Sequence, residues 1–220
     1  VKSLILLYVS FTILLYGGLY TLNAIIDIEA DSKSPVERLR PLPSGKISKK
    51  TALIFAVVLI AAGFFSGFWL FGFKAVYYYG AFIVLNLLYS FFAKHIPFIE
   101  LVLLALTHTL RSLMALHFFN YGIPYMMVIA LLPFHFGLGA NLRELELRNR
   151  GTKARQVLKH YKSVHFHTTH ALVLVALVIF FLADNSRGKL LYAPLLAYYL
   201  ISVFLIRLLP KRLQCSLAGV

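Results

Sequence analysis

The sequence predicts an all-α fold, a polytopic transmembrane helix bundle. Of the 220 residues, 60% are hydrophobic and only 14% are charged, which is too apolar for a water-soluble domain of this length. Apolar stretches long enough to cross about 30 Å of hydrocarbon recur along the chain, and none alternates with the period of two that is typical of a barrel strand. Because backbone groups in lipid must be hydrogen-bonded within their own segment, these stretches are expected to be helices. Seven spans are predicted, at residues 4–26, 51–73, 75–93, 98–119, 122–139, 164–184 and 190–209.

The distribution of basic residues predicts the orientation of the bundle. The net charge of +14 could indicate a nucleic-acid-binding protein, in which Lys and Arg cluster on a soluble face. If the first span starts outside, however, seventeen of the 22 Lys and Arg fall on one side, in the loops at 28–50, 94–97 and 140–163 and in the tail after residue 206. This positive-inside bias predicts that these loops are cytoplasmic and that nucleic acid is not a partner. A basic surface on this side of a membrane attracts phosphorylated substrates.

Two polar loops are much longer than the others, at residues 28–50 and 140–163, and both lie on the cytoplasmic side of the predicted bundle. Long loops in a compact bundle usually carry function, so they are expected to cap the site of a single domain covering residues 1–220. In the first loop, Arg40-Pro41-Leu42-Pro43-Ser44-Gly45 predicts a turn. The second has enough charge and spacing for a short helix at the membrane interface.

One group of residues carries recognisable chemistry. Asn23, Asp27 and Asp31 are spaced by four, so on a continuing helix they stack along one face. Two carboxylates at this spacing repel each other, and the negative end of the helix dipole adds to the repulsion. A bound cation removes this difficulty, and three oxygen-bearing groups suit Mg²⁺, which prefers a few carboxylates together with substrate phosphates. Arg40 and Lys46 follow within the next loop and would complete a clamp for a diphosphate. The alternative is a helix end whose acids are merely solvated.

These residues form part of a longer pattern. Tyr20-x-x-Asn23-x-x-x-Asp27-x-Glu29-x-Asp31, followed by Pro35 and by Arg40-Pro41-Leu42-Pro43-Ser44-Gly45, resembles the first aspartate-rich motif of the UbiA-type prenyltransferase superfamily. Two later tracts are similar to the branch that contains decaprenyl-phosphate phosphoribosyltransferase. They are Tyr89-Ser90-x-x-x-Lys94-x-Ile96 with Leu110-Arg111, and Glu144-Leu145 followed by Gly151, Arg155, Leu158 and Tyr161. Together the matches span about residues 20–161.

The resemblance implies nine helices around a central cavity that opens to lipid, in a bacterial or archaeal plasma membrane, with the active site facing the cytoplasm. This chain would then lack the first helix and the last. Asn23, Asp27 and Asp31 would hold Mg²⁺ on a diphosphate, and Arg40, Lys46 and Lys94 would neutralise the charge of the departing group. Glu144 would supply a second acidic ligand or position a sugar, and Tyr89 and Arg111 would contact substrate.

Two reactions fit this resemblance. In one, phosphoribosyl is transferred from phosphoribosyl diphosphate to a polyprenyl phosphate, which the local matches favour. In the other, a polyprenyl diphosphate donates its prenyl group to an aromatic or glyceryl acceptor. A cation-coupled transporter and an inactive homologue are the alternatives of another class. The second of these stays open because the chain departs from the family pattern at several positions: Ala24, Ser32, Ser34, Glu37, Ala140 and Asn141.

Other polar residues have structural interpretations. Arg111 lies inside an apolar span, so it is expected to face the bundle interior and to pair with an acid, for which Glu100 or an acid on another helix are candidates. His165, His167 and His170 cluster where a span begins, and their spacing favours interfacial histidines over a zinc site. Tyr198 and Tyr199 are interpreted as packing or interface-belt residues.

Overall fold

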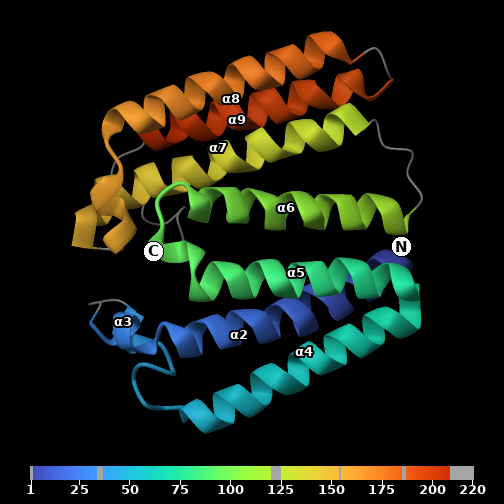
Figure 1. The fold of residues 1–220 in the computed structure, drawn as a ribbon, viewed down its shortest axis with the longest axis vertical. Coiled ribbons are helices and arrows are strands. Elements are labelled where there is room, and N and C mark those ends of the chain that lie inside the picture. The colour runs from blue at the N-terminus through green and yellow to red at the C-terminus, as the bar shows by residue number, and fades with distance from the viewer. Residues whose placement is uncertain (1, 34–36, 120–124, 154, 185–186, 209–220) are drawn as a thin grey trace. The chain divides into compact units, whose positions relative to one another are not determined.

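The computed structural model describes the chain except for residues 1, 34–36, 120–124, 154, 185–186 and 209–220. Every regular element in the described residues is helical, which confirms the predicted all-α class (Figure 1). In chain order the helices are α1 (Lys2–Leu7), a π-helical stretch (Tyr8–Tyr16), α2 (Gly17–Ile26), α3 (Ile28–Ser32), α4 (Lys49–Phe71), α5 (Phe73–Phe91), α6 (Ile99–Phe118), α7 (Tyr125–Arg150), α8 (Ser163–Ala183) and α9 (Tyr192–Leu208).

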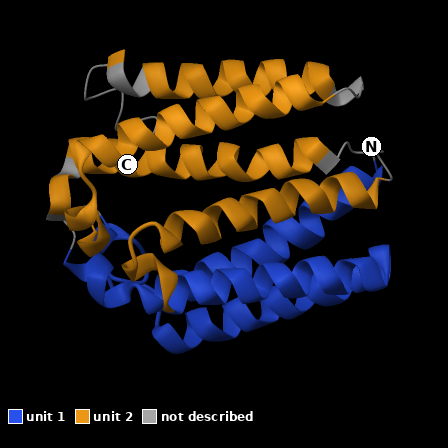
Figure 2. Cartoon of the chain, turned by 45° about the horizontal axis from the view of Figure 1, so that its top comes forward, with its two compact units in different colours: residues 1–91 blue, residues 92–220 orange. Residues whose placement is uncertain are grey.

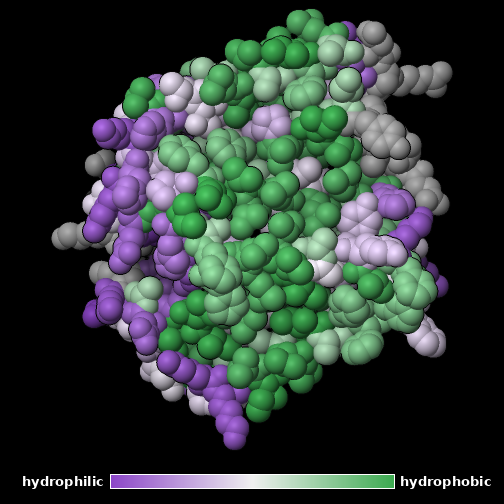
Figure 3. Space-filling model, in the orientation of Figure 1, coloured by the Kyte–Doolittle hydropathy of each residue, from purple (hydrophilic) through white to green (hydrophobic). Residues whose placement is uncertain are grey.

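The helices match the predicted spans. Among the residues that the structure describes, six helical stretches are long and apolar enough to cross a membrane: Lys2–Ile26, Lys49–Phe71, Phe73–His95, Ile99–Phe118, Met126–Asn149 and Ser163–Ala183. The seventh predicted span corresponds to a shorter apolar helix, Lys189–Phe204. Bulky apolar side chains cover the helix flanks (Figure 3); Trp69 on α4 is 88% exposed and Leu172 on α8 is 69% exposed. Such side chains are expected to face lipid, and the protein is an integral membrane protein.

The predicted loop at 140–163 is wrong for its first eleven residues, because α7 continues to Arg150. Ion pairs along the helix stabilise this extension, from Arg143 to Glu146 and from Arg148 to Glu144. The helix ends before Gly151, whose φ of +69° is accessible to glycine. Two 3₁₀ turns follow, at Gly151–Lys153 and Gln156–His160, in place of the short surface helix that the charge pattern predicted.

The chain forms two compact units, residues 1–91 (unit 1) and residues 92–220 (unit 2), which are coloured separately in Figure 2. In unit 1, small residues let helices approach closely. A Cβ on Gly63 of α4 would collide with the backbone of Leu15, and one on Gly67 would collide with the ring of Tyr79. Helix association in lipid depends on such close packing, because burial of apolar surface supplies no driving force there. The Tyr79 hydroxyl lies 2.8 Å from Ser10 Oγ, which joins α5 to the first span.

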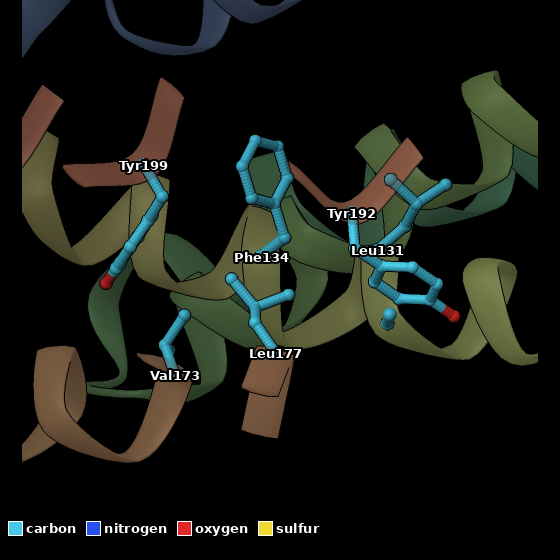
Figure 4. Close-up of a cluster of buried hydrophobic side chains, with 7 residues drawn as sticks. Leu131, Phe134, Val173, Leu177, Tyr192 and Tyr199 are labelled. Atoms are coloured by element: carbon cyan, nitrogen blue, oxygen red, sulfur yellow. The ribbon is translucent and has the colours of Figure 1, made fainter. Parts of the chain in front are cut away.

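Unit 2 has two hydrophobic clusters that hold its polar residues in place. The first joins α7, α8 and α9 (Figure 4) and consists of Ala130, Leu131, Phe134, Val173, Leu177, Tyr192 and Tyr199. The second joins the segment at 156–161 to α6, α7 and α8 and consists of Leu101, Ala140, Val157, Leu158, Tyr161 and Phe166. The second cluster therefore fixes the connection after α7 against the helices that precede and follow it.

Candidate functional site

The aspartate-rich face lies where the first span of unit 1 ends. The helix is interrupted at Asp27, which has φ −87° and ψ 0°, yet the helical hydrogen-bond spacing continues across the break. The Asp27 N–H donates to the Asn23 carbonyl at 3.0 Å, and the Asp31 N–H donates to the Asp27 carbonyl at 2.8 Å. Asn23, Asp27 and Asp31 therefore recur at intervals of one turn, as their spacing predicted.

Arg40 contacts this face. Its Nη1 lies 3.2 Å from Asp31 Oδ2. The predicted turn is present just after it, with the Ser44 N–H donating to the Arg40 carbonyl at 3.0 Å and Gly45 at φ +76°. The pKa of the Asp31 carboxyl lies above its ordinary value. Burial is the main cause, the charge of Arg40 opposes it, and the nearby Asp27 and Glu37 carboxylates add to it.

The donors on this face fit a magnesium ion that also takes ligands from substrate. Asn23 Oδ1 is buried and has no hydrogen-bond partner among the described residues. An orphaned amide oxygen followed at successive turns by two carboxylates is a set of hard-oxygen donors of the kind that Mg²⁺ uses when phosphates and water complete its shell. In the described part of the chain, no three His, Cys, Asp or Glu side chains gather closely enough to hold a metal by themselves.

The two other predicted residues of unit 1 lie apart from these contacts. Lys46 is exposed and makes no ion pair with any described residue. Tyr89 is half-buried in the last turn of α5. Their contacts with substrate stay predictions.

Unit 2 contains a buried ion pair that the sequence did not predict. Glu100, at the start of α6, is completely buried, and the Arg143 guanidinium of α7 binds it through Nε at 3.0 and 3.1 Å and through Nη2 at 3.0 Å. Of the two candidates for the partner of Arg111, Glu100 is therefore wrong. Arg111 lies half-buried eleven residues further along α6, whereas Arg143 comes from the adjacent helix at the level of Glu100.

This pair extends toward the surface and toward the next segment. Arg143 Nη1 binds Glu146 Oε2 at 3.0 Å, and Arg155 Nε donates to the other oxygen of Glu146 at 2.9 Å. The Tyr161 hydroxyl donates to Glu100 Oε1 at 3.3 Å and accepts from the Phe98 N–H at 2.9 Å. Burial raises the pKa of the Tyr161 phenol, which the Phe98 N–H opposes and the Glu100 carboxylate reinforces.

Glu144 belongs to a second buried chain of polar side chains. Its Oε1 accepts from Arg148 Nη2 at 2.6 Å, and its Oε2 lies 3.1 Å from His170 Nε2 on α8. The other ring nitrogen of His170 lies 2.7 Å from the Tyr199 hydroxyl on α9. His170 is thus buried, and its interpretation as an interfacial residue is wrong, while Tyr199 is a packing residue as predicted. The spacing of Glu144 and Arg148 by four was the available sequence signal for part of this chain.

The remaining predicted residues of unit 2 are Lys94 and Arg111, both half-buried. Lys94 lies in the 3₁₀ turn Ala93–His95 that precedes α6. Unit 2 also has an apolar groove of about 360 Å³ on α6, α7 and α8, lined by residues that include Ala105, Pro133 and Ala176. The convergence of Lys94, Arg111 and Glu144 with the aspartate-rich face on one substrate stays a prediction.

Comparison with known proteins finds relatives that share one name. The chain is 26% identical over 190 residues to decaprenyl-phosphate phosphoribosyltransferase of Corynebacterium glutamicum, covering 81% of this chain and 55% of that protein. It is 25% identical over 166 residues to the protein of the same name from Mycolicibacterium smegmatis, covering 74% of this chain and 52% of that protein. The chain thus spans about half the length of the curated relatives that it matches.

Solved structures with the same fold include those of a UbiA homologue from Archaeoglobus fulgidus. The structure bound to GPP and Mg²⁺ superimposes with a TM-score of 0.82 at 16% identity, covering 100% of this chain and 83% of that one. The structure bound to DMAPP and Mg²⁺ superimposes with a TM-score of 0.76 at 17% identity and the same coverage. Residues 2–215 match the family description over nearly the whole chain, and the protein belongs to the UbiA prenyltransferase family.

Proposed function

We propose that the protein is a Mg²⁺-dependent intramembrane transferase that joins a phosphoribosyl group from phosphoribosyl diphosphate to a polyprenyl phosphate. The observation that carries this proposal is the aspartate-rich face at the end of a membrane span, with Asn23, Asp27 and Asp31 one turn apart and Arg40 bound to Asp31. The proposal is also supported by membership of the UbiA prenyltransferase family and by the curated relatives. These relatives are named decaprenyl-phosphate phosphoribosyltransferases.

The residues of unit 1 would bind the diphosphate. When bound, Mg²⁺ would neutralise charge on the diphosphate and stabilise it as a leaving group. Asn23, Asp27 and Asp31 would hold the ion through their oxygens. Arg40, whose side chain is half exposed, would place its remaining N–H donors toward phosphate oxygens, and Lys46 would approach from the same turn.

The residues of unit 2 would serve the rest of the substrate pair. Lys94, in the turn before α6, would neutralise phosphate charge, and Tyr89 of unit 1 and Arg111 of α6 would contact substrate. Glu144 would orient a polar group of the sugar directly or through its partners. The apolar groove and the lipid-facing helices agree with a long hydrocarbon substrate, and the basic segments agree with a site that faces the cytoplasm.

Prenyl transfer is the second candidate function, favoured by the solved homologue structures that contain GPP or DMAPP with Mg²⁺. In that reaction the lipid diphosphate is the donor and an aromatic or glyceryl group the acceptor. The same aspartate-rich face would serve, because a diphosphate departs in both reactions. A cation transporter fits less well, because coupling acids usually lie near the membrane midplane on broken helices.

The test is an assay of the purified protein in nanodiscs with each donor pair, with and without Mg²⁺. We expect diphosphate release with phosphoribosyl diphosphate and polyprenyl phosphate, and a loss of about 100-fold or more in turnover for Asp27→Asn, since the metal site loses a charged ligand. The matched control is Glu29→Gln, an exposed carboxylate two residues away, which is expected to keep activity. Release with neither pair would sink the proposal, and loss of ion flux in Asp27→Asn liposomes would then favour a transporter.

A further inference from the structure

Hydrogen bonds link four side chains of unit 2 in series. The series runs from Tyr199 through His170 and Glu144, which are buried, to the exposed guanidinium of Arg148. We infer that these three residues position Arg148 as a preorganised ligand for a phosphate oxyanion at the end of α7. The inference deepens the proposed function and rests on it for the identity of the phosphorylated substrate. All four residues belong to unit 2, whereas the aspartate-rich face belongs to unit 1.

Burying these polar side chains costs free energy, which suggests that the hydrogen-bonded series has a function. The side chains of Glu144 and His170 are only 4% and 6% exposed, on helices that cross a membrane. Removing a carboxylate from water carries a large desolvation penalty, and a well-packed apolar pair at such a place is often as stable as an ion pair. Both oxygens of Glu144 are engaged, one by Arg148 and one by His170. The carboxylate thus holds neighbouring side chains in place and is not presented as a metal ligand.

The hydrogen bonds are mutually consistent with a neutral imidazole. If Nε2–H of His170 donates to Glu144, then Nδ1 accepts from the Tyr199 hydroxyl, and each group in the chain is satisfied. The backbone makes room for this arrangement at Gly137, where a Cβ would lie only 2.5 Å from the Tyr199 hydroxyl. Three helices therefore cooperate to fix the position of one carboxylate.

Arg148 is the accessible end of the chain. Its side chain is 41% exposed, and it uses Nη2 to bind Glu144 at 2.6 Å. A guanidinium is planar and carries five N–H donors, and the contact with Glu144 uses Nη2 alone. The Nε and Nη1 donors of Arg148 therefore form the pair suited to the bidentate recognition of a phosphate. Arg148 lies two residues before the end of α7, where a membrane span reaches the level of headgroups and phosphorylated ligands.

The inference is tested with Arg148→Gln and Arg148→Lys in nanodiscs, with Lys159→Gln as the control that removes an exposed positive charge elsewhere in unit 2. One arm measures KM and Kd for phosphoribosyl diphosphate and for inorganic diphosphate, and the other arm measures them for a polyprenyl phosphate. We expect Arg148→Gln to weaken one of these ligands by about 10- to 100-fold with little change in kcat. We expect Arg148→Lys to recover only part of this loss, and the arm affected identifies the source of the phosphate.

The positioning role is tested separately with Tyr199→Phe, which keeps the ring but removes the hydroxyl, and with His170→Gln and His170→Ala. We expect His170→Ala to raise the same KM as Arg148→Gln and His170→Gln to restore part of it. A lowered melting temperature with unchanged KM and Kd in all these variants would show that these side chains only stabilise the fold, and it would overturn the inference. Arg148-dependent diphosphate binding without any transferase activity would sustain the site and overturn the proposed function. Transferase activity with normal KM values in Arg148→Gln would sustain the proposed function and overturn the role of Arg148 as a phosphate ligand.

Discussion

At the scale of single residues, one hydroxyl group joins three parts of unit 2. Tyr161 accepts a hydrogen bond from the backbone of Phe98 and donates one to Glu100, which is itself bound to Arg143. Phe98 has a φ of +63°, a conformation that residues other than glycine rarely adopt, and it immediately precedes α6. The Tyr161 hydroxyl thus stabilises an unfavourable backbone turn and a buried carboxylate together.

We expect Tyr161→Phe to lower the free energy of unfolding by about 1–3 kcal/mol, because it leaves the Phe98 N–H without its acceptor and removes a donor from Glu100. Unfolding by sodium dodecyl sulfate, followed by circular dichroism, measures this difference. The control is Tyr77→Phe, since Tyr77 is 73% exposed on α5. Equal stability of the two variants would contradict the role given to Tyr161.

At the scale of the elements, α4 is held by glycine and alanine where it meets the first span. Gly63 contacts the backbone of Leu15 directly, and Gly18 lies against the Ala56 carbonyl, where a Cβ would approach it to 2.8 Å. These contacts involve backbone atoms, which cannot rotate away as a side chain can. The close crossing depends on glycine and alanine, whose side chains are absent or a single methyl group, as is common where helices associate in lipid.

Gly63→Ala is expected to destabilise unit 1 by about 1–3 kcal/mol, because the new methyl group forces α4 away from the first span. Gly80→Ala on α5 is the matched control, since a Cβ there meets nothing within 4 Å. It is expected to be neutral or stabilising by up to about 1 kcal/mol through helix propensity. Melting temperatures in detergent distinguish the two, and similar values would show that the crossing can relax.

At the scale of the whole molecule, the charge distribution predicts how the chain sits in the membrane. The basic residues concentrate in the segments at 28–50, 94–97 and 140–163 and after residue 206, whereas Lys74 lies in the first turn of α5, next to its short connection with α4. Positive loops remain on the cytoplasmic side during insertion. Lys46 and Lys74 are both exposed and should therefore lie on opposite sides of the membrane.

Single-cysteine variants of a Cys215→Ser background test this orientation in sealed inside-out and right-side-out vesicles. Lys46→Cys should react with a membrane-impermeant thiol reagent from the cytoplasmic side and Lys74→Cys from the other side, because α4, the one span between them, crosses the bilayer once. Labelling of both positions from one side would refute the predicted topology and the cytoplasmic site with it.

Much of the fold could be predicted because lipid solvation acts on each segment separately. Each span follows from a continuous apolar run, and the spacing of Asn23, Asp27 and Asp31 follows from helix geometry alone. The end of α7 was missed because residues 140–150 are polar, a composition that describes both a loop and a helix leaving the membrane. The pairs at Arg143 with Glu146 and Glu144 with Arg148 carried the missing signal.

The sequence by itself determined the spans, the aspartate-rich face and the family resemblance, because all three depend on residues near one another in the chain. Only the tertiary structure decided that Glu100 pairs with Arg143, 43 residues away, and that Glu144 meets His170 and Tyr199. Hydrophobic periodicity does not specify which helices are neighbours or at what depth their polar side chains meet. Those partners are chosen by the packing of α6, α7, α8 and α9, where each buried polar group must find a hydrogen bond in the absence of water.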